Sequence, residues 1–267
     1  MANSGATRLD IHRWLILGFA ALVVGSVWLA MATELYILLG IPVGVLVTYL
    51  AIVDFRQLFF LLIACIPIST EVRLPNGFGT DLPTEPLIVG LMVIYLVYAI
   101  RHFPRFRGDF ARHPLTLLLL LHVFWVGITT LTSDLLFVSV KFLLAKLWYV
   151  VTFFFLAGHI LKGEGEFRRF FWTLFWPQLA VVVIVLLRHA TYGFAFSEIH
   201  SVLWPFQRNH VNYAADLALI FPMVVLAIDW YPRGSWQRRI LIGTAALFFG
   251  AIYLSYTRAA YVALLIA

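Results

Sequence analysis

The chain alternates between long apolar runs and short polar segments. Because backbone amides inside a bilayer must find hydrogen-bond partners within their own segment, each apolar run predicts an α-helix. The runs cover residues 14–32, 35–53, 57–70, 84–100, 114–132, 137–161, 170–187, 211–228 and 239–256. A further run starts at Ala259 and has only nine residues by Ala267, too few to cross a hydrocarbon core about 30 Å thick.

This pattern predicts an all-α fold: a polytopic helical membrane protein with about nine complete transmembrane helices and a truncated tenth. We expect residues 1–267 to form a single transmembrane bundle that is a fragment of a longer protein. The run 57–70 is short, but its crossing keeps the arginine-rich residues 101–112 on the cytoplasmic side, as the positive-inside rule requires. The N-terminus is then cytoplasmic. The first run has nineteen uncharged residues, more than a signal-peptide core of about 7–15, so we expect an uncleaved helix.

The composition agrees with a membrane protein. Hydrophobic residues make up 63% of the chain and charged residues 12%, whereas a soluble domain has about 25% charged residues. The net charge of +6 is explained by basic cytoplasmic loops, so membrane lipids and not nucleic acid are the expected partners. The single cysteine, Cys65, lies in an apolar run, and we expect no disulfide, metal site or cofactor.

The first polar island is Trp204–Asp216, the densest run of hydrogen-bonding side chains, which begins within the longest exterior loop, residues 188–210. If a helix begins near Asn209, that residue is a good N-cap. Asn209, Asn212 and Asp216 then follow an i, i+3, i+7 pattern on one helix face, with Tyr213 beside them. Two interpretations stay open. Asp216 either pairs with a lysine or arginine of a neighbouring helix, or its face lines a polar cavity that opens to the exterior.

A second polar island, residues 255–258, interrupts the apolar sequence near the C-terminal end. The predicted topology places its Arg258 on the same exterior side as Arg208. Two guanidinium groups and the positive end of a helix dipole favour phosphate oxygens, which arginine binds through two parallel hydrogen bonds. Lys141, about a turn inside the exterior end of the run 137–161, is another candidate. An anion at this depth predicts a lipid-linked phosphate or pyrophosphate.

Three short stretches resemble those of a known family. Pro205–Ala214, ahead of a long apolar helix, resembles a segment of the O-antigen ligase and O-antigen polymerase superfamily. Leu254–Tyr261 is similar to the Ser-Arg-Gly-like turn of that family, with Thr257 and Ala259 in place of serine and glycine. Asp81–Pro86 also resembles relatives of the family.

This resemblance implies an inverting, metal-independent membrane glycosyltransferase of lipopolysaccharide or cell-surface polysaccharide biosynthesis. Such enzymes move a glycan from an undecaprenyl-pyrophosphate carrier to a lipid-core or glycan acceptor at the periplasmic face of the bacterial inner membrane. By this resemblance Arg208 and Arg258 are the catalytic residues, which bind the pyrophosphate and stabilise its developing charge. Together with the polar residues identified above, we expect the substrate-binding residues to be Asn209, His210, Asn212, Tyr213, Asp216 and Lys141.

Several alternatives remain open. A polymerase of the same superfamily shares the donor chemistry of a ligase. A transporter could use Asp216, Lys141 and Arg258 as an ion or proton relay, and a non-catalytic scaffold is a third class. Relatives of the family carry a histidine in an exterior loop after later helices, and the sequence stops before it. We therefore expect residues 1–267 alone to be inactive unless the missing part is supplied.

Overall fold

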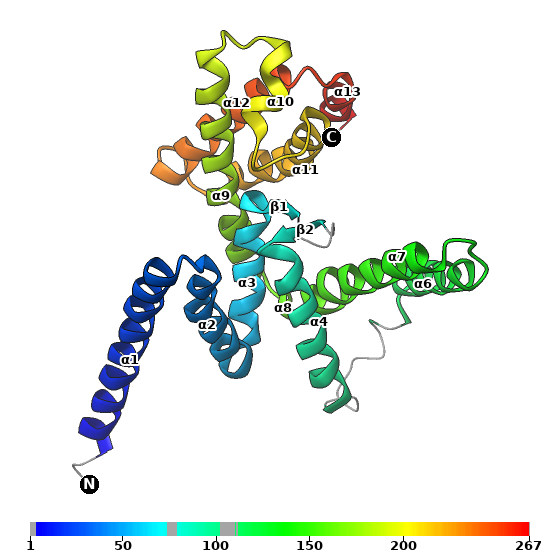
Figure 1. Cartoon of the computed structure of the whole chain (residues 1–267). Helices are drawn as coiled ribbons and strands as arrows, with labels where there is room; N and C mark the ends of the chain where they lie inside the picture. The colour runs from blue at the N-terminus through cyan, green and yellow to red at the C-terminus, as the bar shows by residue number, and fades with distance from the viewer. Residues whose placement is uncertain (1–3, 74–78, 102–109, 111, 267) are drawn as a thin grey trace. The chain divides into compact units, whose positions relative to one another are not determined.

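The computed structural model describes residues 4–73, 79–101, 110 and 112–266 (Figure 1). The chain divides into two compact units, Met1–Leu58 and Phe59–Ala267. Helices make up most of both units, and in the described residues the strands are limited to one short antiparallel hairpin. The expected all-α class is confirmed, with this hairpin as an addition.

The first unit contains two apolar helices, α1 (Ser4–Thr33) and α2 (Gly40–Val53), joined through the 3₁₀ turn η1 (Tyr36–Leu39). Large apolar side chains stay exposed along α1; Trp14, for example, is 73% exposed. Exposed apolar side chains along a helix of this length suit contact with lipid.

The second unit starts within α3 (Phe55–Cys65), and its helical elements continue to the end of the described chain. After α3 come η2 (Ile66–Ile68), β1 (Thr70–Arg73), β2 (Gly79–Leu82), α4 (Thr84–Arg101), α6 (Pro114–Leu131), α7 (Leu136–Val150), the π-helix η4 (Val151–Leu156), α8 (Ala157–Ile160), α9 (Glu164–Thr191), η5 (Phe196–Glu198), α10 (Ile199–Leu203), α11 (His210–Ala227), η6 (Ile228–Trp230), α12 (Trp236–Leu254) and α13 (Arg258–Ile266). The interval 188–210, expected to be a loop, is therefore partly helical.

Six helices in the described residues are long and apolar enough to cross a membrane. They are Arg13–Thr33, Thr84–Arg101, Pro114–Leu131, Leu136–Ile160, Glu164–Thr191 and His210–Trp230. The apolar helices Gly40–Val53 and Phe55–Ile68 are shorter, and 14 residues span only about 21 Å. The helix α12 is long enough, but its first turn contains the charged pair Arg238 and Arg239. The chain is thus a multi-pass membrane protein, but the expected count of nine complete spans is not supported.

The core of the second unit lies between α9, α11 and α12. On α11 the buried residues follow helical spacing, so one face of the helix is packed against its neighbours; they are Tyr213, Ala214, Leu217, Ile220, Val224 and Ala227. The helix α12 presents Leu241, Phe248 and Ile252 to the same cluster. This packing fixes the start of α11, where the polar residues of the first island lie.

Two adjacent phenylalanines on α12 test this core. Phe248 is 0% exposed and Phe249 is 60% exposed. Phe248→Ala leaves a cavity and should lower the free energy of unfolding by about 3–5 kcal/mol. Phe249→Ala should change it little, because that ring lies at the surface. Unfolding of the detergent-solubilised variants measures both, and equal effects would contradict the packing described here.

Candidate functional site

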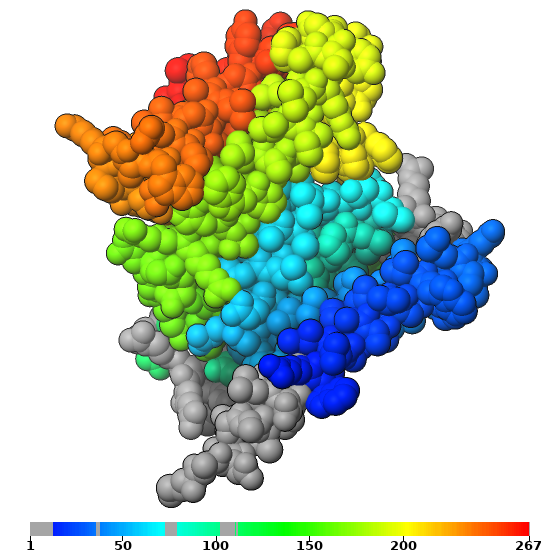
Figure 2. All heavy atoms as spheres, turned by 90° about the vertical axis from the view of Figure 1, so that its left-hand side faces the viewer, coloured from blue at the N-terminus to red at the C-terminus, as the bar shows by residue number. Residues whose placement is uncertain are grey.

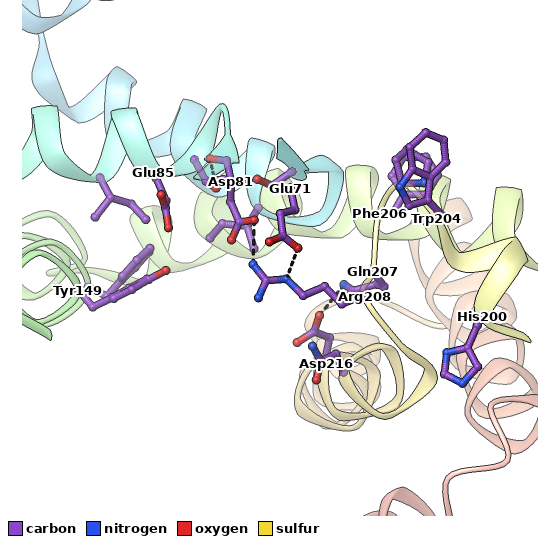
Figure 3. A pocket seen from close by; sticks show the side chains of 17 residues that line it. Glu71, Asp81, Glu85, Tyr149, His200, Trp204, Phe206, Gln207, Arg208 and Asp216 are labelled. Carbon is purple, nitrogen blue, oxygen red and sulfur yellow. Dashed lines mark hydrogen bonds and ion pairs between the residues drawn. The ribbon is translucent and has the colours of Figure 1, made fainter. Parts of the chain in front are cut away.

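A polar pocket with a volume of about 890 Å³ opens in the second unit, where the hairpin, α4, α7 and the segment before α11 meet (Figure 3). Four carboxylates and one guanidinium face it, together with aromatic and amide side chains. The lining residues with polar or aromatic side chains are Ser69, Glu71, Asp81, Thr84, Glu85, Tyr149, Phe153, His200, Trp204, Phe206, Gln207, Arg208, Asn212 and Asp216.

Arg208 lies between two carboxylates of the hairpin. Its Nε is 3.0 Å from Glu71 Oε2, and its Nη2 is 3.3 Å from Asp81 Oδ1 (Figure 3). Glu71 and Asp81 are cross-strand partners in the β1–β2 register, and like charges placed opposite each other are destabilising. The guanidinium offsets that repulsion. Because the Arg208 side chain is 57% exposed, solvent screens these pairs, and each is worth no more than about 1 kcal/mol.

The start of α11 agrees with the sequence-based expectation. Asn209 is the N-cap of α11, and its side-chain oxygen accepts a hydrogen bond of 2.8 Å from the backbone N–H of Asn212. Asn212 and Asp216 lie about one helical turn apart and both line the pocket. The predicted polar face therefore exists, with Asn209 used as its cap.

Asp216 accepts a hydrogen bond of 2.7 Å from Gln207 Nε2 (Figure 3). Within the described part of the chain, its carboxylate forms no ion pair. Of the two interpretations left open by the sequence, the structure agrees with the pocket-lining one. The neutral amide leaves the carboxylate able to accept a further proton or hydrogen bond.

Two predicted site residues lie away from the pocket. Tyr213 is 1% exposed and belongs to the hydrophobic core, because each step along a helix turns the side chain by about 100° and carries Tyr213 off the polar face. Lys141 is exposed and does not line the pocket. It precedes the pocket residue Tyr149 by eight positions on α7, which is about 12 Å along the helix axis.

The second island lies against the start of α11. Thr257 Oγ1 donates a hydrogen bond of 3.3 Å to the backbone carbonyl of His210, and Tyr256 Oη donates one of 2.6 Å to the carbonyl of Phe194. Arg258 is the first residue of α13 and is exposed. It has no acidic partner among the described residues and lies outside the pocket lining. The two islands are thus neighbours, although Arg208 and Arg258 do not share one pocket.

His210 forms a contact with a histidine of α10. Its Nδ1 lies 3.2 Å from His200 Nε2, with the two rings close to perpendicular. One of these two nitrogens must carry a proton for the contact to be a hydrogen bond. Because His200 lines the pocket and His210 begins α11, the pair connects the pocket rim to the helix start.

Sequence reasoning missed most of the pocket charge. Glu71 and Tyr149 were not predicted, and Asp81 and Glu85 entered only through the family resemblance. Four carboxylates against one guanidinium leave a formal charge of −3 with His200 neutral. The acids were visible in the short polar segment between residues 69 and 86, but only the folded hairpin brings them to Arg208. An acidic pocket is unexpected for a site predicted to bind an anion.

Comparison of the chain with protein-family models, with curated proteins and with solved structures finds no match.

Proposed function

We propose that this protein is a multi-pass membrane glycosyltransferase of the O-antigen ligase type, which moves a glycan from undecaprenyl-pyrophosphate to a lipid-linked acceptor. The observation that carries the proposal is the 890 Å³ pocket, a size within the usual range for small-molecule sites. It combines carboxylates and amides, which hydrogen-bond sugar hydroxyls, with the aromatic rings of Tyr149, Trp204 and Phe206. The donor and acceptor sugars would meet in this pocket.

In this proposal Arg208 exchanges its partners when the donor binds. Its present pairs with Glu71 and Asp81 are solvent-exposed and therefore weak. A pyrophosphate offers more negative charge and several oxygens for the guanidinium fork. Arg258, exposed and without an acidic partner among the described residues, would contact the pyrophosphate from the neighbouring island.

Asp216 is the proposed general base. Its carboxylate accepts the proton of the acceptor hydroxyl while the hydroxyl oxygen forms a bond to the anomeric carbon and the bond from that carbon to the pyrophosphate breaks. The pyrophosphate leaves with the bonding electrons, stabilised by Arg208. Gln207, which donates to Asp216 Oδ2 at 2.7 Å, orients the base as the third group of such a set does.

The proposed function requires the pocket to lie on one particular side of the membrane. The pocket would face the periplasm from the bacterial inner membrane, with the N-terminus cytoplasmic. This orientation requires the short helices α2 and α3 and the helix α12 to cross as well, giving nine crossings before α13. Crossing by all nine keeps most arginines on the cytoplasmic side, in agreement with the positive-inside rule.

A second class of function is favoured by a specific observation. The formal charge of −3 on the pocket side chains suits a cation or proton, as in a coupled transporter. The relay expected from the sequence, however, included Lys141, which lies outside the pocket lining. A polymerase of the same superfamily would use the same donor site and differ in its acceptor.

Donor binding tests the proposal separately from glycan transfer. The protein in lipid nanodiscs should bind undecaprenyl pyrophosphate and fail to bind undecaprenol, because the pyrophosphate supplies the charge that Arg208 recognises. Under conditions where the protein transfers glycan from a loaded donor, a ligase should label a lipid-core acceptor, and a polymerase should instead lengthen the donor-linked glycan. Equal affinity for undecaprenol and its pyrophosphate would rule out the proposed donor site.

A further inference from the structure

The structure gathers basic and aromatic residues at the opposite end of α11 from the pocket. Here the start of α9, the turn η6 and the start of α12 pack together, and Figure 2 shows the orange start of α12 beside the yellow-green α9. The guanidinium of Arg168 lies 5.4 Å from the ring centre of Trp230. Trp172 Nε1 donates a hydrogen bond of 2.9 Å to Tyr231 Oη. These contacts join the start of α9 to the turn η6 and the residue after it; Trp172 and Tyr231 are 59 positions apart in the sequence.

The charge at this end is positive. The six basic residues of the three segments are Lys162, Arg168, Arg169, Arg233, Arg238 and Arg239, and the three acidic ones are Glu164, Glu166 and Asp229. Two acids are already paired, since Glu164 contacts Arg168 at 2.6 Å and Asp229 contacts Arg238 at 3.5 Å. The end as a whole therefore presents an excess of cations to its surroundings.

Arg233 and Arg239 are arginines of this end that a ligand can reach. Both are exposed, and neither forms an ion pair with a described acidic side chain. Arg239 Nη2 donates to the carbonyl of Gly234 at 3.0 Å, which leaves further donors of its guanidinium available. By contrast, Arg238 is held by the carbonyls of Ile228 and Tyr231 as well as by Asp229, so it stabilises the turn.

Exposed aromatic rings border these cations. Trp236 is 56% exposed and Phe167 is 42% exposed. Phe167 and Trp236 lie near the ends of the apolar spans Glu164–Thr191 and His210–Trp230, where aromatic side chains sit at the boundary between headgroups and acyl chains. A ligand here meets apolar rings on one side and guanidinium groups on the other.

We propose that this end binds an anionic phospholipid of the surrounding bilayer, with its phosphate on Arg233 and Arg239 and its acyl chains against Trp236 and Phe167. Basic residues at the membrane surface attract anionic headgroups, and the guanidinium fork matches phosphate oxygens. The bordering rings explain why the ligand is a lipid and not free phosphate. The site is remote from the polar pocket and does not depend on glycan transfer.

Lipid titration of the detergent-solubilised protein, followed by native mass spectrometry, tests this site. Dioleoyl-phosphatidylglycerol should bind more tightly than dioleoyl-phosphatidylcholine, which has no net charge. The double variant Arg233→Ala/Arg239→Ala should weaken phosphatidylglycerol binding by about fivefold for each cation removed. Binding of phosphatidylcholine should stay the same, because its acyl chains meet the same rings.

A matched control separates a defined site from general attraction to positive charge. Arg101→Ala/Arg112→Ala removes the same charge from exposed positions outside this end and should leave phosphatidylglycerol binding unchanged. Arg233→Lys/Arg239→Lys keeps the charge and should retain most of the affinity. Equal losses in the two alanine pairs, equal affinity for the two lipids, or displacement of the lipid by inorganic phosphate at matched concentration would each overturn the proposal.

Discussion

Arg208→Ala should weaken the binding of undecaprenyl pyrophosphate by about 10- to 100-fold. A hydrogen bond to a charged group contributes about 1.5–3 kcal/mol, and 1.4 kcal/mol corresponds to a factor of ten. The affinity of Arg208→Lys for the donor should lie between those of the unmodified protein and Arg208→Ala, because a single ammonium group keeps the charge but loses the two-pronged geometry of the guanidinium. Calorimetric titration in nanodiscs measures the change. Arg101→Ala, at the far end of α4, is the control and should bind normally.

The same residue could matter only because it holds the hairpin together. The partner variant Glu71→Gln/Asp81→Asn decides between these explanations. If Arg208 serves the donor, removing its two competing carboxylates should strengthen donor binding by a few-fold, since exposed pairs of this kind are worth at most about 1 kcal/mol each. If Arg208 only joins the hairpin to the segment before α11, the double variant should weaken binding, as Arg208→Ala does. The proposal is supported if donor affinity falls in Arg208→Ala and rises in Glu71→Gln/Asp81→Asn, and it is contradicted if donor affinity falls in both.

The parts of the structure that depend on local sequence were predictable. The N-cap role of Asn209 depends on a side chain and a backbone N–H only three residues apart, and such motifs are visible in a single chain. The helical character of the apolar runs was predictable for a similar reason, because a bilayer leaves few other ways to pair the backbone. The span count was not, because a run such as 35–53 forms the helix Gly40–Val53, which is too short to cross by length alone.

The charge of the pocket depends on contacts that the sequence does not show. Arg208 and Asp81 are 127 positions apart, and their pairing requires the hairpin β1–β2 that residues 69–83 were not expected to form. Tyr213 was predicted to be a site residue but is buried in the core, for a related reason. A polar face and a packed face are neighbours on the same helix, and only the positions of α9 and α12 determine that this ring enters the core.

For the two polar islands, the topology predicted from the sequence indicated their proximity but not the direction of their arginine side chains. Placing residues 204–216 and 255–258 at one membrane surface agrees with the hydrogen bond between Thr257 and the carbonyl of His210. That predicted placement does not determine where the guanidinium groups of Arg208 and Arg258 point. Arg208 turns toward the hairpin acids, whereas Arg258 stays exposed at the start of α13. A joint phosphate site therefore requires the donor to extend from the pocket rim to the second island.

Asp216→Asn should lower the rate of glycan transfer by about 100- to 10,000-fold, the range expected when a general base is lost. Asparagine keeps the shape of the side chain and the contact with Gln207, so donor binding should be unchanged and the loss should fall on the catalytic rate. Transfer is measured with a fluorescently labelled glycan on the undecaprenyl-pyrophosphate donor and a lipid-core acceptor, under conditions where the unmodified protein is active. Gln207→Ala, which removes the orienting hydrogen bond of 2.7 Å, should produce a smaller loss.

Glu85→Gln is the matched control for this loss. Glu85 also lines the pocket and accepts a hydrogen bond of 2.7 Å from Thr80 Oγ1, but the proposal gives it no proton to accept, so its variant should transfer glycan at a near-normal rate. A large loss in Glu85→Gln with normal transfer by Asp216→Asn would move the base to Glu85. Normal transfer by both variants would place the base outside these two carboxylates. If neither glycan transfer nor donor binding occurs and Asp216→Asn instead abolishes proton uptake into vesicles, the negative charge of the pocket serves a coupled transporter.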